Sequence, residues 1–123
     1  MALSRLAAEF AAEIKNHDWS DAPWRLDRAG HDRSTDSNRG QHAFGPDETA
    51  SIRTNVMWVV AQVLGHADPQ FDPYEFAEAC GVRTRTRRGE LDGYITAGLR
   101  MDYQTRRYAQ PGTWTSTDRL SSR

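Results

Sequence analysis

Apolar side chains recur every three or four residues near the start of the chain. They are Leu3, Leu6, Ala7, Phe10, Ala11 and Ile14. This spacing places them on one face of an α-helix. Ser4 stands just before most of them, with a side chain suited to an N-cap. The pattern predicts an amphipathic helix over about residues 4–16 that ends near His17.

The broadest apolar stripe lies in the middle of the chain, over residues 47–64. Its members are Ile52, Val56, Val59, Val60 and Val63, widened by Met57 and Trp58. Pro46 and the two acidic residues after it suit the first turn of a helix. A stripe this wide predicts the central helix of the fold, packed on more than one side. We expect the segment from Gly65 to Pro69 to end it.

A short helix of about two turns is predicted before the central one, with two tryptophans anchoring it. Ser20 can cap it, Pro23 is tolerated in its first turn and Gly30 can close it. Residues 30–46 follow with almost no apolar content. Such a composition is typical of a mobile loop, or of a segment that becomes ordered on binding.

The pattern after the central helix is less uniform. The run Asp72-Pro73-Tyr74-Glu75 has the arrangement of a capping box and predicts a short helix that stops at Gly81. Apolar spacing from Leu91 onward indicates a final helix, weakened by two glycines. The β-branched and aromatic residues within 91–108 favour a β-hairpin instead. Both alternatives stay open for this segment.

These elements together predict a mainly α-helical protein. We expect a compact bundle of four or five helices, with a small C-terminal β-hairpin as the variable part. A length of 123 residues suits one domain. We assign residues 1–108 to a single helical domain with a polar loop at about 30–46, and residues 109–123 to an irregular C-terminal tail.

Charge is distributed unevenly along the chain. The total is −1, yet residues 1–82 carry −6 and residues 83–123 carry +5. No apolar run approaches the length of a transmembrane helix. The N-terminal stretch resembles a signal sequence, but Glu9 and Glu13 interrupt it. We therefore expect a cytoplasmic protein with no membrane partner.

Residues able to catalyse a reaction or bind a metal are few and scattered. Cys80 is the single cysteine, and its surroundings predict a small buried apolar residue rather than a nucleophile. His31, Asp32, Asp36 and His42 have side chains that bind metals, but their spacing matches no metal-binding motif. We expect them to be solvated. With no catalytic or phosphate-binding motif either, the sequence predicts a non-catalytic protein without cofactor or metal.

Residues 76–82 resemble the first helix and turn of a helix-turn-helix. An alanine inside the helix, a glycine at the turn and an aliphatic residue after it stand in that motif's order. The basic residues that follow could contact phosphates or guanine edges, and they are Arg83, Arg85, Arg87 and Arg88. The resemblance fails where a second helix should bury an aliphatic residue, because Thr86 and two arginines occupy those positions. A DNA-binding regulator that uses residues 72–100 is the alternative function.

The tryptophans indicate binding to another protein. Trp24 and Trp114 lie near polar segments, and tryptophan is favoured as an anchor in protein interfaces. These two residues are the predicted partner-binding anchors, with burial in the core as the alternative. The opposite charges of the two parts of the chain also allow copies of it to associate as a homo-oligomer, or a partner of complementary charge to bind.

The stretches DWSDAPWRLDRAGHDR and RTNVMWVVAQVLGHADPQFDPYEFAEACGV are similar to those of small accessory proteins encoded by actinobacterial phages. The similarity covers about residues 16–82 and agrees with a composition of fifteen arginines and one lysine. It implies no fold. It implies a viral protein that binds and modulates a host bacterial protein in the host cytoplasm, with the replication and transcription machinery as candidates. DNA is an expected partner only under the alternative function.

Overall fold

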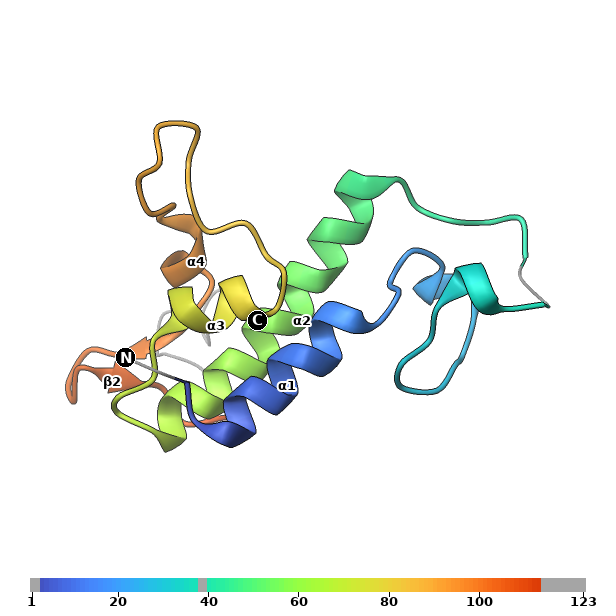
Figure 1. Ribbon diagram of the computed structural model, residues 1–123. Coiled ribbons are helices and arrows are strands. Elements are labelled where there is room, and N and C mark those ends of the chain that lie inside the picture. Colours follow the sequence, from blue (N-terminus) through green and yellow to red (C-terminus); the bar gives the residue numbers. More distant parts are fainter. Residues whose placement is uncertain (1–2, 38–39, 114–123) are drawn as a thin grey trace, which may run out of the picture.

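The helix predicted near the N-terminus is present in the computed structural model, which describes residues 3–37 and 40–113. α1 spans Arg5–Asn16 (Figure 1), and the hydroxyl oxygen of Ser4 accepts a hydrogen bond of 3.1 Å from the amide of Ala7. This bond satisfies one of the free amides of the first turn. The helix ends at His17, as the sequence predicts.

The buried face of α1 is not the one with the largest side chains. Ala7, Ala11 and Ile14 are buried, whereas Leu6 is 58% exposed and Phe10 is 42% exposed. α1 packs against two helices, α2 (Pro46–Ala67) and α3 (Pro73–Ala79). Alanines between them let the three helices approach closely. The apolar stripe of the sequence is thus divided, with the two alanines and Ile14 inside and Leu6 and Phe10 partly outside.

α2 is the central helix, as predicted, but it is longer than the pattern indicates. It continues through Gly65, because this glycine lies against the ring of Tyr108. A Cβ atom at Gly65 would stand 2.7 Å from Cδ2 of that ring. The glycine therefore serves close packing, and the helix ends at Asp68, whose amide donates to the carbonyl of Leu64 at 3.0 Å. Pro69 follows at once.

α3 begins as the capping-box pattern predicts. The carboxylate of Asp72 accepts hydrogen bonds from the amide of Tyr74 at 2.9 Å and from the next amide at 3.4 Å. The core lies where α1, α2 and α3 meet. Its largest fully buried apolar side chains are Met57, Phe76 and Ile95.

The segment for which helix and hairpin were alternatives contains both, each in a short form. α4 spans Tyr94–Ala97, a single turn. The strands β1 (Met101–Asp102) and β2 (Arg107–Tyr108) then pair in antiparallel register.

Side chains of α2 hold this C-terminal segment in place. The amide of Gln62 donates to the carbonyls of Arg100 and Ala109, each at 3.0 Å, and its oxygen accepts from the amide of Arg100 at 2.8 Å. The indole nitrogen of Trp58 donates to the carbonyl of Ile95 at 2.9 Å. Polar contacts from a buried helix face thus position a segment that has little periodicity of its own.

The prediction of a short helix over about residues 20–30 is wrong. Ala22–Trp24 form one 3₁₀ turn, within a segment that we call the polar lobe, residues 17–45. Asp21 occupies the position before the turn but makes no capping bond. Its carboxylate contacts His31 instead, so the side chain that could have started a helix is used in a long-range contact.

Hydrogen bonds between distant positions connect the polar lobe. The amide of Asp18 donates to the carbonyl of His31 at 2.8 Å, and the amide of Phe44 donates to the carbonyl of Ser20 at 2.6 Å. A second 3₁₀ turn, Arg33–Thr35, lies between these contacts. Most of the predicted polar loop belongs to this lobe, and two of its residues, His31 and Phe44, take part in these bonds.

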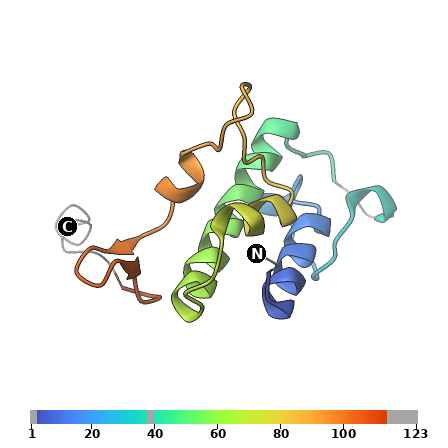
Figure 2. The same ribbon diagram turned by 60° about the vertical axis from the view of Figure 1, so that its left-hand side comes forward.

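The fold class is confirmed. The described residues form a compact, mainly helical protein with four α-helices and one small antiparallel hairpin near the C-terminus. The polar lobe extends from one end of the bundle, and a loop after α3 extends from another side (Figure 1; Figure 2). Over the part of the chain that is described, no helix combines the length and apolar character needed to cross a membrane.

Candidate functional site

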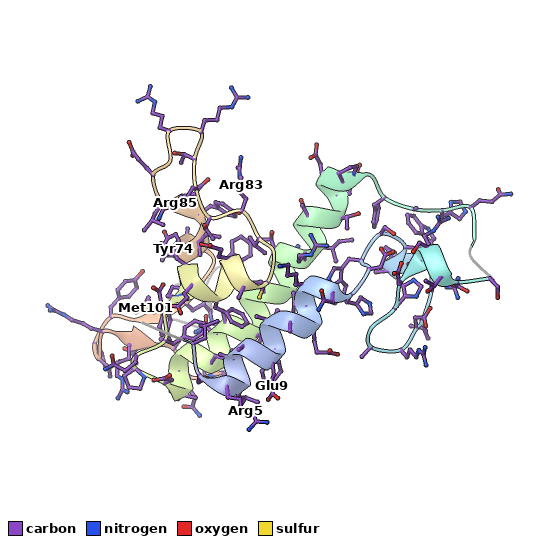
Figure 3. All side chains as sticks on the ribbon, viewed as in Figure 1. Arg5, Glu9, Tyr74, Arg83, Arg85 and Met101 are labelled. Atoms are coloured by element: carbon purple, nitrogen blue, oxygen red, sulfur yellow. The ribbon has the colours of Figure 1, made fainter. Side chains whose placement is uncertain are left out.

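The four arginines singled out in the sequence lie on one protruding segment. We call it the arginine arm, residues 83–92, seen at the upper left of Figure 1. An isolated β-bridge pairs Arg85 with Leu91, so the residues between them form a narrow turn with Arg87 and Arg88 at its end. All four arginines are exposed, and Figure 3 shows that Arg83 and Arg85 lie near the base of the arm.

The arm stands where a helix-turn-helix needs its second helix. α3 and the turn at Gly81, with φ of 82°, match the predicted first helix and turn. None of residues 83–92, all of them described, is helical. The run Thr86-Arg87-Arg88 offers no apolar side chain to bury, so the chain pairs with itself at the bridge. A DNA contact through residues 72–100 would therefore use the arm and not a recognition helix.

A groove of about 750 Å³ lies between the base of the arm and the first half of α2. The rings of Trp58 and Tyr94 line it and meet edge to face, with centroids 6.0 Å apart. The hydroxyl of Tyr94 donates to the carbonyl of Arg83 at 2.6 Å. Burial raises the pKa of Tyr94, so this hydroxyl keeps its proton at neutral pH. The ring thus ties the base of the arm to α4.

Trp24, one of the two predicted anchors, lies on the polar lobe and is 46% exposed. Its ring stacks on His42 with centroids 5.3 Å apart and tilts against Phe44 at 4.7 Å. The Trp24 ring therefore joins residues 42–44 to the first 3₁₀ turn of the lobe, while about half of the residue faces solvent. The other predicted anchor, Trp114, falls outside the described residues.

Two helices that pack together also expose large apolar side chains. Leu6 and Phe10 lie one turn apart on α1, and Val59 and Val63 lie one turn apart on α2. A groove of about 310 Å³ runs beside the two valines, between α2 and residues 98–113. We call these four residues the α1–α2 apolar surface.

The polar lobe is organised around His31, whose side chain is only 6% exposed. Both ring nitrogens face carboxylate oxygens. Nε2 lies 3.0 Å from Oδ1 of Asp21, and Nδ1 lies 2.9 Å from Oδ2 of Asp27. A neutral imidazole has one N–H and can donate to only one of these oxygens. The other contact needs a further proton, on the ring or on the carboxyl group, or a cation shared by nitrogen and carboxylate.

Other charged groups surround this histidine. Asp27, His31 and Asp36 each offer a ligand atom, and these atoms lie within 4.8 Å of one another, the one such group in the described part of the chain. The guanidinium of Arg25 pairs with Asp27 at 3.5 Å and also with Asp36. Arg33 approaches the buried Asp21 at 3.6 Å. The lobe is thus a network of alternating charges.

Hydrogen bonds favour the ionised form of two carboxylates in this network. Burial raises the pKa of Asp18, but hydrogen bonds from Ser20 and from the amide of Arg33 outweigh burial, and the pKa is lowered overall. The amide of Arg28 lowers the pKa of Asp27, and the basic groups beside it act in the same direction. Both groups are therefore charged at neutral pH.

The sequence analysis expected His31, Asp32, Asp36 and His42 to be solvated, and this expectation is wrong for His31, which is buried. His31 and Asp36 do come together, and Asp27 joins them. Asp32 caps the second 3₁₀ turn, and His42 lies on the tryptophan ring. Asp27 and His31 are four residues apart, a spacing that brings side chains together on a helix. No helix forms there, so their contact depends on the folded lobe, and the sequence did not single out Asp27.

Cys80 is fully buried in the core, which confirms the prediction of a small apolar residue. Burial raises the pKa of its thiol to about 12. At neutral pH the sulfur therefore stays protonated and is a poor nucleophile.

Comparisons of this chain with protein-family models, with curated proteins and with solved structures found no match. The function therefore has to be argued from three features of the molecule. They are the α1–α2 apolar surface, the arginine arm and the His31 network.

Proposed function

We propose that this protein is a non-catalytic accessory protein that binds another protein through the α1–α2 apolar surface. The observation that carries the proposal is the division of α1, where Ala7 and Ala11 are buried while Leu6 and Phe10 stay exposed. Full burial of a leucine or phenylalanine side chain stabilises by about 1.5–3 kcal/mol. α1 forgoes much of this stabilisation in its own core, and a partner that covers the two side chains recovers it.

We include two exposed valines of the neighbouring helix in the proposed surface. Val59 and Val63 are exposed on α2, and the groove beside them can receive a side chain of a partner. Arg5 and Glu9 form an exposed ion pair at 3.8 Å on α1 and project outward from it (Figure 3). An apolar centre with a charged rim is a common organisation of protein interfaces.

We propose a host bacterial protein as the partner, on the assumption that the chain is an accessory protein of an actinobacterial phage. Under this proposal the viral protein meets its partner in the host cytoplasm and modulates it, with the replication and transcription machinery as candidates. Trp24 is a second anchor in this proposal, because half of its ring faces solvent.

The test uses a double variant, Leu6→Ser with Phe10→Ser, and a tagged full-length chain. A pull-down from nuclease-treated actinobacterial lysate, followed by mass spectrometry, should recover one stoichiometric protein with the wild type. The double variant should lose it, because two polar side chains replace the centre of the surface. The matched control is Leu26→Ser, which removes a fully exposed leucine from the polar lobe.

The outcomes separate the alternatives. Retention of the same protein by the double variant would overturn the assignment of the surface. Association of two copies of this chain predicts instead a doubled mass in gel filtration that the double variant abolishes. Trp24→Ala should weaken the interaction by a smaller factor than the double variant.

A second candidate function, nucleic-acid binding, is favoured by the arginine arm. Residues 83–92 carry four arginines against two acidic residues, and every one of the arginines is exposed. Two of the arginines stand at the end of the arm, away from the bundle, where they can reach phosphates or a groove of a duplex.

Fluorescence anisotropy with a labelled DNA duplex at several salt concentrations tests this candidate. The double variant Arg87→Ala with Arg88→Ala should bind DNA more weakly. The slope of log binding constant against log salt concentration should become shallower by about two units, one for each lost phosphate contact. The control, Arg5→Ala with Arg28→Ala, removes the same charge elsewhere. Equal losses in both variants would mean that only net charge matters and would remove the arm from the proposal.

A further inference from the structure

We propose that the polar lobe binds one divalent transition-metal ion through Nδ1 of His31 and the carboxylates of Asp27 and Asp36. The three ligand atoms lie within 4.8 Å of one another. Nδ1 of His31 and Oδ2 of Asp27 are 2.9 Å apart. Ligands about 2.0–2.2 Å from a tetrahedral zinc ion lie roughly 3.4 Å from each other. Nδ1 of His31 and Oδ2 of Asp27 would therefore move apart by about 0.5 Å to share an ion.

The surroundings of His31 resemble the support that metal-binding histidines have. A metal-bound imidazole usually donates its other N–H to a carboxylate, which fixes the tautomer and the orientation of the ring. Asp21 is placed for this role, since its Oδ1 lies 3.0 Å from Nε2. Asp21 is 2% exposed, and its second oxygen, Oδ2, lies 3.6 Å from Nε of Arg33. A carboxylate buried this deeply beside a histidine has an evident role if the ring is bound to a cation.

The charge of the lobe is consistent with a divalent cation. The polar lobe, residues 17–45, contains five aspartates and four arginines, a net charge of −1 with neutral histidines. Arg25 pairs with both Asp27 and Asp36, so an incoming ion competes with its guanidinium. A divalent ion bound by Asp27 and Asp36 would balance the charge of these two carboxylates.

The lobe also lacks what stabilises the rest of the molecule. Among its described residues the buried ones are Asp21 and His31, a carboxylic acid and an imidazole. A segment too small for an apolar core is often held by a metal ion, whose binding energy then stabilises the fold. Asp27, His31 and Asp36 span ten positions of the chain, so an ion would join the end of the second 3₁₀ turn to the segment before it.

The donor set indicates the class of ion. One imidazole nitrogen and two carboxylates suit Zn²⁺ and neighbouring first-row ions, whereas Mg²⁺ and Ca²⁺ prefer oxygen alone. Three protein ligands leave at least one position of the ion for water.

Isothermal titration calorimetry of the metal-free full chain with Zn²⁺ tests the proposal. We expect a single ion per chain and a rise in melting temperature. Asp36→Asn should lower the affinity about ten-fold or more, and Asp21→Asn should lower it by about 10–100-fold as the support of the imidazole is lost. Co²⁺ should give visible absorption bands of a bound ion with the wild type, and His31→Gln should abolish them.

The controls remove similar groups from the same lobe. Asp32→Asn takes away an equal charge next to His31, and His42→Gln takes away an exposed imidazole. Both should keep the wild-type affinity for Zn²⁺. No zinc binding by the wild type would overturn the proposal. An equal loss of Zn²⁺ affinity in Asp32→Asn and Asp36→Asn would also overturn the proposal, because attraction to the net charge of the lobe would then explain the binding.

Discussion

The helical bundle and the polar lobe are consecutive in the chain but are held together by different interactions. In the bundle, Met57, Phe76 and Ile95 are fully buried where helices meet. In the lobe, the buried side chains among the described residues are Asp21 and His31. Dispersion and the hydrophobic effect stabilise the first region, and hydrogen bonds between charged groups stabilise the second. The two regions should therefore respond differently to the same kind of perturbation.

Under our proposals this difference also separates the functional roles of the two regions. The bundle carries the α1–α2 apolar surface and, through Tyr94, the base of the arginine arm. The lobe depends on a few side chains, and the proposed metal ion would stabilise it. A change in the lobe should consequently leave the bundle folded.

Loss of a core side chain should have the largest effect. Phe76→Ala is expected to lower the free energy of unfolding by about 3–5 kcal/mol, because it removes a fully buried ring and leaves a cavity. Urea unfolding followed by circular dichroism measures this. Tyr103→Ala, at an exposed position, should change stability by less than about 0.5 kcal/mol. Similar values for the two variants would contradict the assignment of the core.

Loss of a buried charge should act locally. Asp21→Ala is expected to destabilise the lobe by about 2 kcal/mol, because His31 and Arg33 lose a buried partner. Hydrogen exchange followed by NMR should show faster exchange at the amide of Asp18, which donates to His31, and unchanged exchange in α2. Equal acceleration throughout α1 to α3 would mean that the lobe and the bundle unfold as one unit.

A steric change should test how tightly the C-terminal segment packs on the bundle. A Cβ atom at Gly98 would lie 2.0 Å from Cε2 of Trp58, so Gly98→Ala should destabilise by about 1.5 kcal/mol. Gly93→Ala is the control, since a Cβ there meets nothing within 4 Å. Thermal unfolding of both variants measures the difference. Equal melting temperatures would show that the segment moves away from α2 without cost.

Lowering the pH should have the smallest effect on stability, and the structural change should begin in the lobe. The pKa values of Asp18 and Asp27 are lowered in the folded state. Their contribution is therefore present above the unfolded pKa, about 4, and is lost as the pH falls through the lower folded values. An NMR titration from about pH 5 downward should show lobe resonances changing before those of α2. Asp18→Asn should reduce this difference, whereas Asp47→Asn, at an exposed site on α2, should not.

The sequence predicts the bundle well because its signals are local. The stripe of α2, the Ser4 cap of α1 and the Asp72 cap of α3 all act within a few residues. The division of α1 into buried alanines and exposed large residues could not be predicted, because it depends on where two other helices pack. The continuation of α2 through Gly65 depends on the distant ring of Tyr108 in the same way.

The candidate sites were predictable in part for the same reason. The Arg83–Arg88 run is visible as composition, but its shape follows from an isolated bridge to Leu91. The His31 network joins residues whose spacing has no periodicity, and Asp21 could equally have capped a helix. Only the folded arrangement decides between a local cap and a long-range partner for such a side chain.

The most direct test of the contrast between bundle and lobe is native-state hydrogen exchange of wild type and His31→Gln. If charged hydrogen bonds around His31 hold the lobe, the amides of Asp18 and Arg33 should lose protection while the amides of α1, α2 and α3 keep theirs. Equal loss of protection in the three helices, or unchanged protection at Asp18 and Arg33, would contradict this account of the molecule.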